Sequence, residues 1–164
     1  MGDGMKLVLL PGMDGTGILF EPLLLRLADL DVEVIELPSA GPQDYESLAR
    51  YTAARIGGRD CVVLAESFSG GVAEALLNDR SLNIKHVIFV ASFLSSPSRV
   101  LSRVAALLPI KVLTAIPILA PLVLRTFLFG RAASPEAIAL FRKAEESDYD
   151  FAAGYNALAP VLRD

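Results

Sequence analysis

Residues 60–71 read Asp-Cys-Val-Val-Leu-Ala-Glu-Ser-Phe-Ser-Gly-Gly, and this stretch decides the fold. Residues 60–65 form a short apolar run that is typical of a buried strand. The small residues after it open a helix that we expect over residues 68–78. Ser67 lies between the two elements, at a tight turn. A buried strand that turns directly into a helix is typical of a parallel sheet with helices on its faces.

The rest of the first half of the chain repeats this alternation of strand and helix. Apolar runs predict three more strands, over residues 5–10, 32–37 and 84–91. Helical spacing predicts helices over residues 17–29 and 44–56, with Thr16 and Asp44 as N-caps and Gly57 as a stop. The sequence therefore predicts an α/β fold with a doubly wound parallel sheet of about four strands.

The alternation ends after Ser92, which divides the chain into a core and a cap. We expect residues 1–96 to form the α/β core and residues 97–164 a helical cap or lid, without the further strands that would complete the sheet. The most apolar stretch, residues 112–124, is interrupted by Pro117 and Pro121. A membrane-spanning helix needs about 20 apolar residues, so this stretch is not expected to cross a membrane. The apolar side chains of the cap suit either an acyl-chain pocket or ordinary helix packing.

Composition excludes several classes of function. The chain has 164 residues, of which 53% are hydrophobic, and a net charge of −4 without any block of Lys or Arg, so we expect no nucleic-acid partner. The single cysteine, Cys61, cannot form an internal disulfide or a thiolate metal cluster, and no secretory signal is recognisable. We therefore expect a cytoplasmic protein that binds no metal and no cofactor.

The turn around Ser67 has the pattern of a nucleophile elbow. In such an elbow the residues two before and two after the serine must be small, because the strand and helix backbones nearly touch there. Ala65 and Ser69 occupy these positions, where glycine is more common. The helix that follows directs its N-terminal amides at the site, where they can stabilise an oxyanion. The alternative is a structural turn in which Ser67 only caps a helix.

A second loop, residues 10–17 (Leu-Pro-Gly-Met-Asp-Gly-Thr-Gly), follows the first predicted strand. The carboxyl ends of parallel strands share one edge of a sheet, so this loop is expected close to Ser67. The backbone N–H of Met13 could then supply one oxyanion donor and that of Phe68 the other. Neither the Gly-Lys-Ser/Thr ending of a nucleotide phosphate loop nor the dinucleotide-binding glycine spacing is present, which disfavours nucleotide binding.

These two segments resemble those of the α/β-hydrolases. The loop over residues 10–17 looks like the oxyanion loop of that family, and residues 65–71 look like its elbow. The chain is most similar to bacterial hydrolases and plant phytyl-ester-synthase-type acyltransferases that carry Leu-Pro-Gly-x-Asp-Gly and a Glu-Ser-Phe elbow. The resemblance implies a partial α/β-hydrolase fold, with Ser67 as the nucleophile acting on a small-molecule acyl substrate.

The partners that such a serine needs are not found in the sequence. The one histidine, His86, is expected near the start of the fourth strand, on the order of 15 Å or more from the edge where Ser67 lies. Ser92, where some members of the family place the acid, is not acidic, and the lysines are not expected close to Ser67. Four acidic residues of the cap are expected on its solvated face: Glu145, Glu146, Asp148 and Asp150. The resemblance places the acid and the histidine on later strands.

Two hypotheses follow. The first is a serine hydrolase acting on an ester, a thioester or a related acyl compound, and inactive in this form because it lacks the histidine and the acid. The second is a non-catalytic α/β module that binds a hydrophobic ligand or a partner chain. In both cases the fourth strand, residues 84–91, is left at an edge of the sheet, so we expect a homo-oligomer formed through this strand or through the cap.

Overall fold

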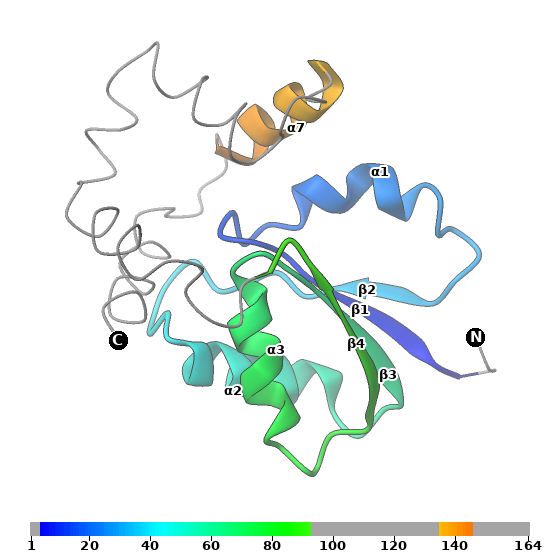
Figure 1. Cartoon of the computed structure of the whole chain (residues 1–164), viewed down its shortest axis with the longest axis vertical. Helices are drawn as coiled ribbons and strands as arrows, with labels where there is room; N and C mark the ends of the chain where they lie inside the picture. Colours follow the sequence, from blue (N-terminus) through cyan, green and yellow to red (C-terminus); the bar gives the residue numbers. More distant parts are fainter. Residues whose placement is uncertain (1–3, 93–134, 146–164) are drawn as a thin grey trace.

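A computed structural model of the chain describes residues 4–92 and 135–145. Its sheet is parallel throughout, with the strands in the order β2-β1-β3-β4 (Figure 1). The strands are β1 (Lys6–Leu10), β2 (Val32–Val34), β3 (Cys61–Glu66) and β4 (Ile84–Val90). The predicted α/β class and parallel four-stranded sheet are confirmed. The expected cap, except for residues 135–145, lies outside the described residues.

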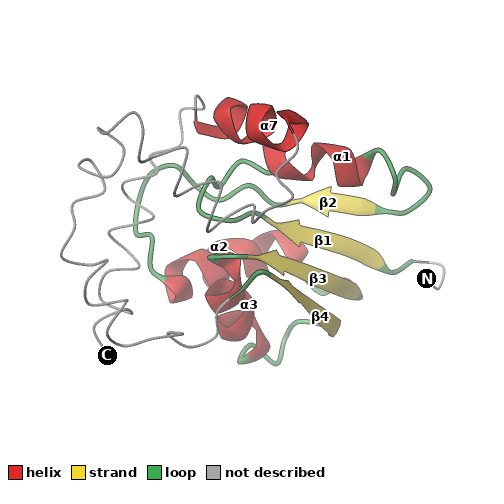
Figure 2. Ribbon diagram, turned by 45° about the horizontal axis from the view of Figure 1, so that its top comes forward, coloured by secondary structure: helices red, strands yellow, loops and turns green. Residues whose placement is uncertain are grey.

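Helices cover both faces of the sheet, as a doubly wound fold requires (Figure 2). One face carries α2 (Tyr45–Ile56) and α3 (Ser69–Leu77), which pack against each other. The other face carries the 3₁₀ turn η1 (Ile18–Phe20) and the short helix α1 (Glu21–Leu24). Against η1 packs α7 (Pro135–Glu145), where Lys143 forms an ion pair with Glu21.

Strand β1 explains why the strand segments are continuously apolar. Successive side chains of a strand point to opposite faces of the sheet. Val8 and Leu10 are fully buried on the side of α2 and α3, whereas Leu7 and Leu9 are buried with Phe20 on the side of η1. Because both faces of the central strands are covered, no position in β1 after Lys6 can be polar without losing buried apolar area.

The segment after the first loop differs from the expected helix over residues 17–29. Only η1 and α1 form, and irregular turns follow them. The cap position is occupied by Gly17, with a φ of +72°, and not by the expected Thr16. Thr16 precedes the cap, and its hydroxyl accepts a hydrogen bond from the Ile18 N–H at 3.3 Å. Leu23, Leu24 and Leu27 still pack against the cluster around Phe20, whereas Leu25 is 83% exposed.

The other helix limits agree closely with the pattern of cap residues. Asp44 is the N-cap of α2 and accepts the Ser47 N–H at 2.8 Å, and Gly57 ends the helix with a φ of +60°. Helix α3 begins at Ser69, with Phe68 as its N-cap, one residue later than predicted. Strand β2 ends at Val34, although the Ile35 N–H still donates to the Leu9 carbonyl at 3.0 Å.

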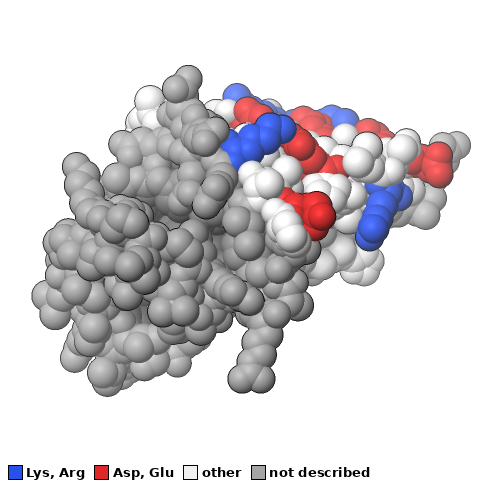
Figure 3. Space-filling view, turned by 90° about the horizontal axis from the view of Figure 1, so that it is seen from above, with Lys and Arg blue, Asp and Glu red and all other residues white. Residues whose placement is uncertain are grey.

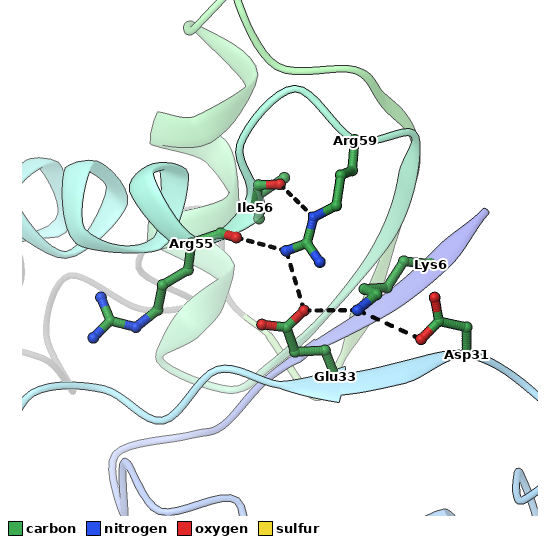
Figure 4. A network of polar contacts seen from close by, with 6 residues as sticks. All are labelled: Lys6, Asp31, Glu33, Arg55, Ile56 and Arg59. Carbon is green, nitrogen blue, oxygen red and sulfur yellow. Dashed lines mark hydrogen bonds and ion pairs between the residues drawn. The ribbon is translucent and has the colours of Figure 1, made fainter. Parts of the chain in front are cut away.

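An ion network joins the amino ends of the strands (Figure 4). The Lys6 ammonium lies 3.5 Å from Asp31 and 3.1 Å from Glu33, and Arg59 reaches the same Glu33 oxygen at 3.1 Å. Burial acts to raise the pKa of Glu33, but the hydrogen bonds and charges of Lys6 and Arg59 outweigh burial and lower it. The guanidinium of Arg59 also donates to the carbonyls of Ile56 and Arg55, at 2.8 and 2.6 Å. The network therefore ties β1, β2 and the turn before β3 together.

On the described part of the face shown in Figure 3, charged side chains of both signs are interspersed and no patch of one sign gathers. No helix among residues 4–92 and 135–145 is long and apolar enough to cross a membrane.

Candidate active site

The strand order places two loops side by side at the carboxyl edge of the sheet. The chain leaves β1 to build β2 on one side and later returns to build β3 on the other. The gap between β1 and β3 is therefore the topological switch point, where open parallel sheets bind ligands. The loop after β1 and the turn after β3 both begin at this gap. They are the two segments that the sequence singled out.

Ser67 lies in the turn between β3 and α3, outside any regular helix. Its φ is +49°, in the left-handed region that few residues other than glycine adopt. The Ser67 N–H donates to the Val90 carbonyl of β4 at 2.9 Å, which holds the turn against the neighbouring strand. The side chain is half-buried. A serine in this strained conformation at the end of a strand has the geometry that a nucleophile elbow requires.

The small residues around Ser67 are needed because other groups lie close to the helix backbone. A Cβ added to Gly70 would lie 2.7 Å from the Ser92 Cβ. One added to Gly71 would lie 2.5 to 2.7 Å from three atoms of the Tyr45 ring. Tyr45 in turn packs on Phe68, with 5.1 Å between the ring centroids. Aromatic packing from α2 thus fixes the first turn of α3.

Direct contacts join the two loops. The Ser69 hydroxyl donates to the Pro11 carbonyl at 2.5 Å, and both residues are buried. A Cβ added to Gly12 would lie 3.4 Å from the Ser67 Cβ, so the loop backbone passes directly beside the serine. The sequence identified Ser69 only as a small residue and gave no signal of its hydrogen bond across the gap.

Two backbone N–H groups in the loop and turn around Ser67 have no acceptor within the described part of the chain. Neither the Met13 N–H nor the Phe68 N–H donates to any group of the residues that the structure describes. Met13 directly follows Gly12, and Phe68 directly follows Ser67. The positive end of the α3 dipole lies at the same place. Backbone donors without partners at a helix N-terminus are suited to binding negative charge.

Two carboxyl groups complete the surroundings of Ser67, and the sequence interpretation missed both. Asp14 is 2% exposed; its Oδ2 accepts the Thr16 hydroxyl at 2.7 Å and the Thr16 N–H at 3.3 Å. Glu66 ends β3, immediately before Ser67. Burial and the charge of Asp14 raise the pKa of Glu66 to about 7, although a backbone hydrogen bond from Gly12 acts to lower it. The sequence did contain a signal for Glu66, which is an acidic residue directly after the apolar residues 61–65.

The remaining candidates lie away from Ser67 or outside the described residues. His86 is exposed and pairs with Val62, near the start of β3. The Ser92 hydroxyl donates to the Ala65 and Val90 carbonyls, at 2.9 and 3.2 Å. Lys6 and Lys85 form ion pairs at the amino edge, and Lys143 forms one with α1. Glu145 ends α7. Lys111, Glu146, Asp148 and Asp150 lie outside the described residues.

Within the described ranges no three His, Cys, Asp or Glu side chains cluster closely enough to hold a metal ion.

The fold was compared with those of known proteins. No family model and no curated protein matches this chain. An esterase from Exiguobacterium antarcticum is 18% identical, with a TM-score of 0.64 over 100% of this chain and 68% of its own. MenH from S. aureus is 15% identical, with a TM-score of 0.67 over 100% of this chain and 67% of its own.

A third solved structure, the epoxide hydrolase CorEH, is 21% identical, with a TM-score of 0.66 over 99% of this chain and 68% of its own. All three structures have the α/β-hydrolase fold. The chain therefore has the α/β-hydrolase fold over the part of that fold that it spans.

Proposed function

We propose that the protein is a serine hydrolase of small acyl compounds, such as esters or thioesters, with Ser67 as its nucleophile. One observation carries the proposal. Ser67 has a φ of +49° at the switch point of the sheet and lies beside Gly12, and the N–H groups of the residues that follow Gly12 and Ser67, Met13 and Phe68, have no acceptor among the described residues. The solved structures of similar fold support it, because they include an esterase and an epoxide hydrolase.

The geometry suits acyl transfer. The Ser67 Oγ would attack the carbonyl carbon while its proton passes to a base, and the carbonyl oxygen would become an oxyanion. The Met13 and Phe68 N–H groups would then donate to this oxyanion. In oxyanion holes of this kind one donor is worth about 3 to 4 kcal/mol of barrier. Expulsion of the leaving group forms an acyl-serine, which water or an alcohol then cleaves.

The base is the missing part. His86 is the one histidine among the 164 residues, and its partner in the sheet, Val62, lies five residues before Ser67. At about 3.3 Å per strand residue this separation is roughly 15 Å. We therefore propose that residues 1–164 by themselves bind acyl compounds without turning them over.

Labelling with a fluorophosphonate tests the nucleophile. We expect the natural gene product that contains these residues to gain one adduct, located at Ser67 by peptide mass spectrometry. S67A should abolish this adduct, while S39A, which removes an exposed serine hydroxyl, should label like the parent. Labelling that survives S67A, or a folded protein that resists the reagent, would end the nucleophile assignment.

His86 is exposed and lies away from Ser67, so it cannot serve as the base. This favours a second candidate, a non-catalytic module that binds a hydrophobic ligand or a partner chain. An intact-mass measurement on the native protein separates the two functions. A native chain of 164 residues supports the module, whereas a longer chain with an acid and a histidine on further strands supports the enzyme.

We further propose that two copies associate through β4. Among the described strands β4 is at the edge of the sheet, and three successive apolar residues, Ile88, Phe89 and Val90, are 45%, 40% and 42% exposed. A strand edge with unpaired backbone groups and apolar side chains recruits another strand. Light scattering of the parent protein should show at least a dimer and that of F89K a smaller species; a monodisperse parent monomer would contradict the proposal.

The single cysteine, Cys61, is a buried free thiol, which fits a reducing compartment. We propose a cytoplasmic location on this ground; cell fractionation tests it, and recovery in an exported fraction would refute it.

A further inference from the structure

Two buried carboxyl oxygens close to Gly12 have no hydrogen-bond partner among the residues that the structure describes. They are Oδ1 of Asp14 and Oε2 of Glu66. Measured from a Cβ built on Gly12, the Asp14 Oδ1 lies at 3.6 Å and the Glu66 Cδ at 4.0 Å. The same point lies 3.4 Å from the Ser67 Cβ. The two carboxyl groups therefore face a common position in the loop backbone beside the proposed nucleophile.

Each carboxyl group is otherwise held in place. Asp14 has its Oδ2 engaged by the Thr16 hydroxyl and N–H, so its orientation is fixed and Oδ1 is left over. Glu66 receives a backbone hydrogen bond from Gly12, which leaves Oε2. Buried polar atoms are nearly always paired, and each unpaired one costs roughly 1 to 3 kcal/mol. A pair of such atoms around one residue calls for an explanation.

We propose that a protonated Glu66 side chain donates a hydrogen bond to Asp14, and that this pair acts as a positioning device that holds the loop over residues 11–15 against the elbow. The proposal rests on the serine-hydrolase function, because the loop so held carries the Met13 amide. A protonated Glu66 Oε2 would donate to the Asp14 Oδ1 and satisfy both atoms at once. With the proton lost, two negative charges would oppose each other across Gly12, and the Met13 amide would move relative to Ser67.

The electrostatics agree with the geometry. Of the described residues, Asp14 is the charged group that acts on Glu66, and together with burial it raises the pKa of Glu66 to about 7. Two carboxylates that share a site commonly retain one proton between them. The Gly12 amide favours the carboxylate form and limits the shift. The geometry around Ser67 is thus expected to change between about pH 6 and pH 8.

Nuclear magnetic resonance on the complete 164-residue chain tests the pair without requiring any activity. The ¹³C signal of the Glu66 carboxyl should titrate near pH 7, and the amide signals of Gly12 and Met13 should follow with the same midpoint. D14N should lower this midpoint by on the order of one pH unit, because it removes the charge and turns an amide N–H toward Glu66. A Glu66 midpoint near 4.5, or amide signals that do not follow it, would overturn the proposal.

A labelling experiment then tests the effect on Ser67. E66Q keeps a neutral donor and an acceptor in place of the protonated carboxyl. In the natural gene product that contains these residues, the ratio of the fluorophosphonate labelling rates, parent over E66Q, should fall at least about threefold from pH 6 to pH 8, whereas E36Q, changed at an exposed glutamate, should keep the parent profile. A constant ratio would refute the positioning role. Absence of labelling in all forms, with the titration intact, would instead refute the nucleophile.

Discussion

The Ser69 hydroxyl donates a hydrogen bond to the Pro11 carbonyl, 58 residues earlier in the chain and across the gap between β3 and β1. In an elbow with glycine at this position no such bond can form. Here the second residue after Ser67 fixes the loop that follows β1. The serine that replaces glycine in the pattern therefore contributes to the alignment of the proposed oxyanion donors.

S69A should destabilise the fold by about 1 to 3 kcal/mol, because the buried Pro11 carbonyl loses its donor. Alanine is a better helix former than serine at the start of α3, so helix propensity partly offsets the loss. Urea denaturation of the parent, S69A and S39A measures the effect. Serine 39 is exposed, so S39A should leave the midpoint within experimental error. An equally small change in S69A would show that the hydrogen bond adds no stability.

Ser67 should be more strained than a glycine would be at the same place. A side chain at a φ of +49° costs on the order of 1 kcal/mol, which glycine does not incur. S67G should therefore unfold at a higher temperature than S67A, which keeps the Cβ and the strain, while neither variant accepts the fluorophosphonate at this position. Thermal unfolding by circular dichroism compares the two. A lower midpoint for S67G would contradict a strained turn.

The stability of the parent relative to E66Q should depend on pH. The pKa of Glu66 is raised in the folded protein from 4.5 to about 7, so the contribution of its proton is fully present below about pH 4.5 and is lost as pH rises through 7. The largest difference that this shift allows is about 3 kcal/mol. Urea denaturation of both proteins between pH 4.5 and 8 should show the parent losing stability relative to E66Q. A difference that is independent of pH would mean that Glu66 has an ordinary pKa.

G71A should destabilise the protein by about 1 to 3 kcal/mol, because the new methyl group meets the Tyr45 ring at 2.5 Å. Removing the ring should relieve the clash, so G71A should cost less in a Y45A background. The matched control is G58A, since a Cβ at Gly58 has nothing within 4 Å. A double-mutant cycle by urea denaturation measures the coupling. Equal costs of G71A with and without Tyr45 would exclude the ring as the cause.

The order of strands and helices could be predicted because the two central strands, β1 and β3, are buried on both faces and read as nearly unbroken apolar runs. The elbow could be predicted because Ala65 and Ser69 satisfy a local steric rule. The helix over residues 17–29 was predicted too long: α1 ends at Leu24, although Leu27 of the same apolar spacing still packs against the cluster that contains Phe20. Irregular turns can satisfy the same apolar spacing as a continuous helix.

The Glu66–Asp14 pair could not be predicted for a different reason. Their proximity follows from the order β2-β1-β3-β4, which places the loop after β1 beside the turn after β3. In the sequence η1, α1, β2, α2 and most of β3 lie between the two residues. Only the crossover geometry brings the carboxyl groups to the same glycine, and this geometry depends on the whole sheet.

The ion network of Lys6, Glu33 and Arg59 has a consequence for how the protein responds to its solvent. Dissolved salt screens charge pairs, whereas a hydroxyl–carbonyl contact such as Ser69 to Pro11 is nearly insensitive to it. Different forces therefore stabilise the two ends of the sheet. Concentrated electrolyte would weaken the contacts at the amino ends of the strands first, whereas the hydrogen bond beside Ser67, at the carboxyl ends, would be little affected.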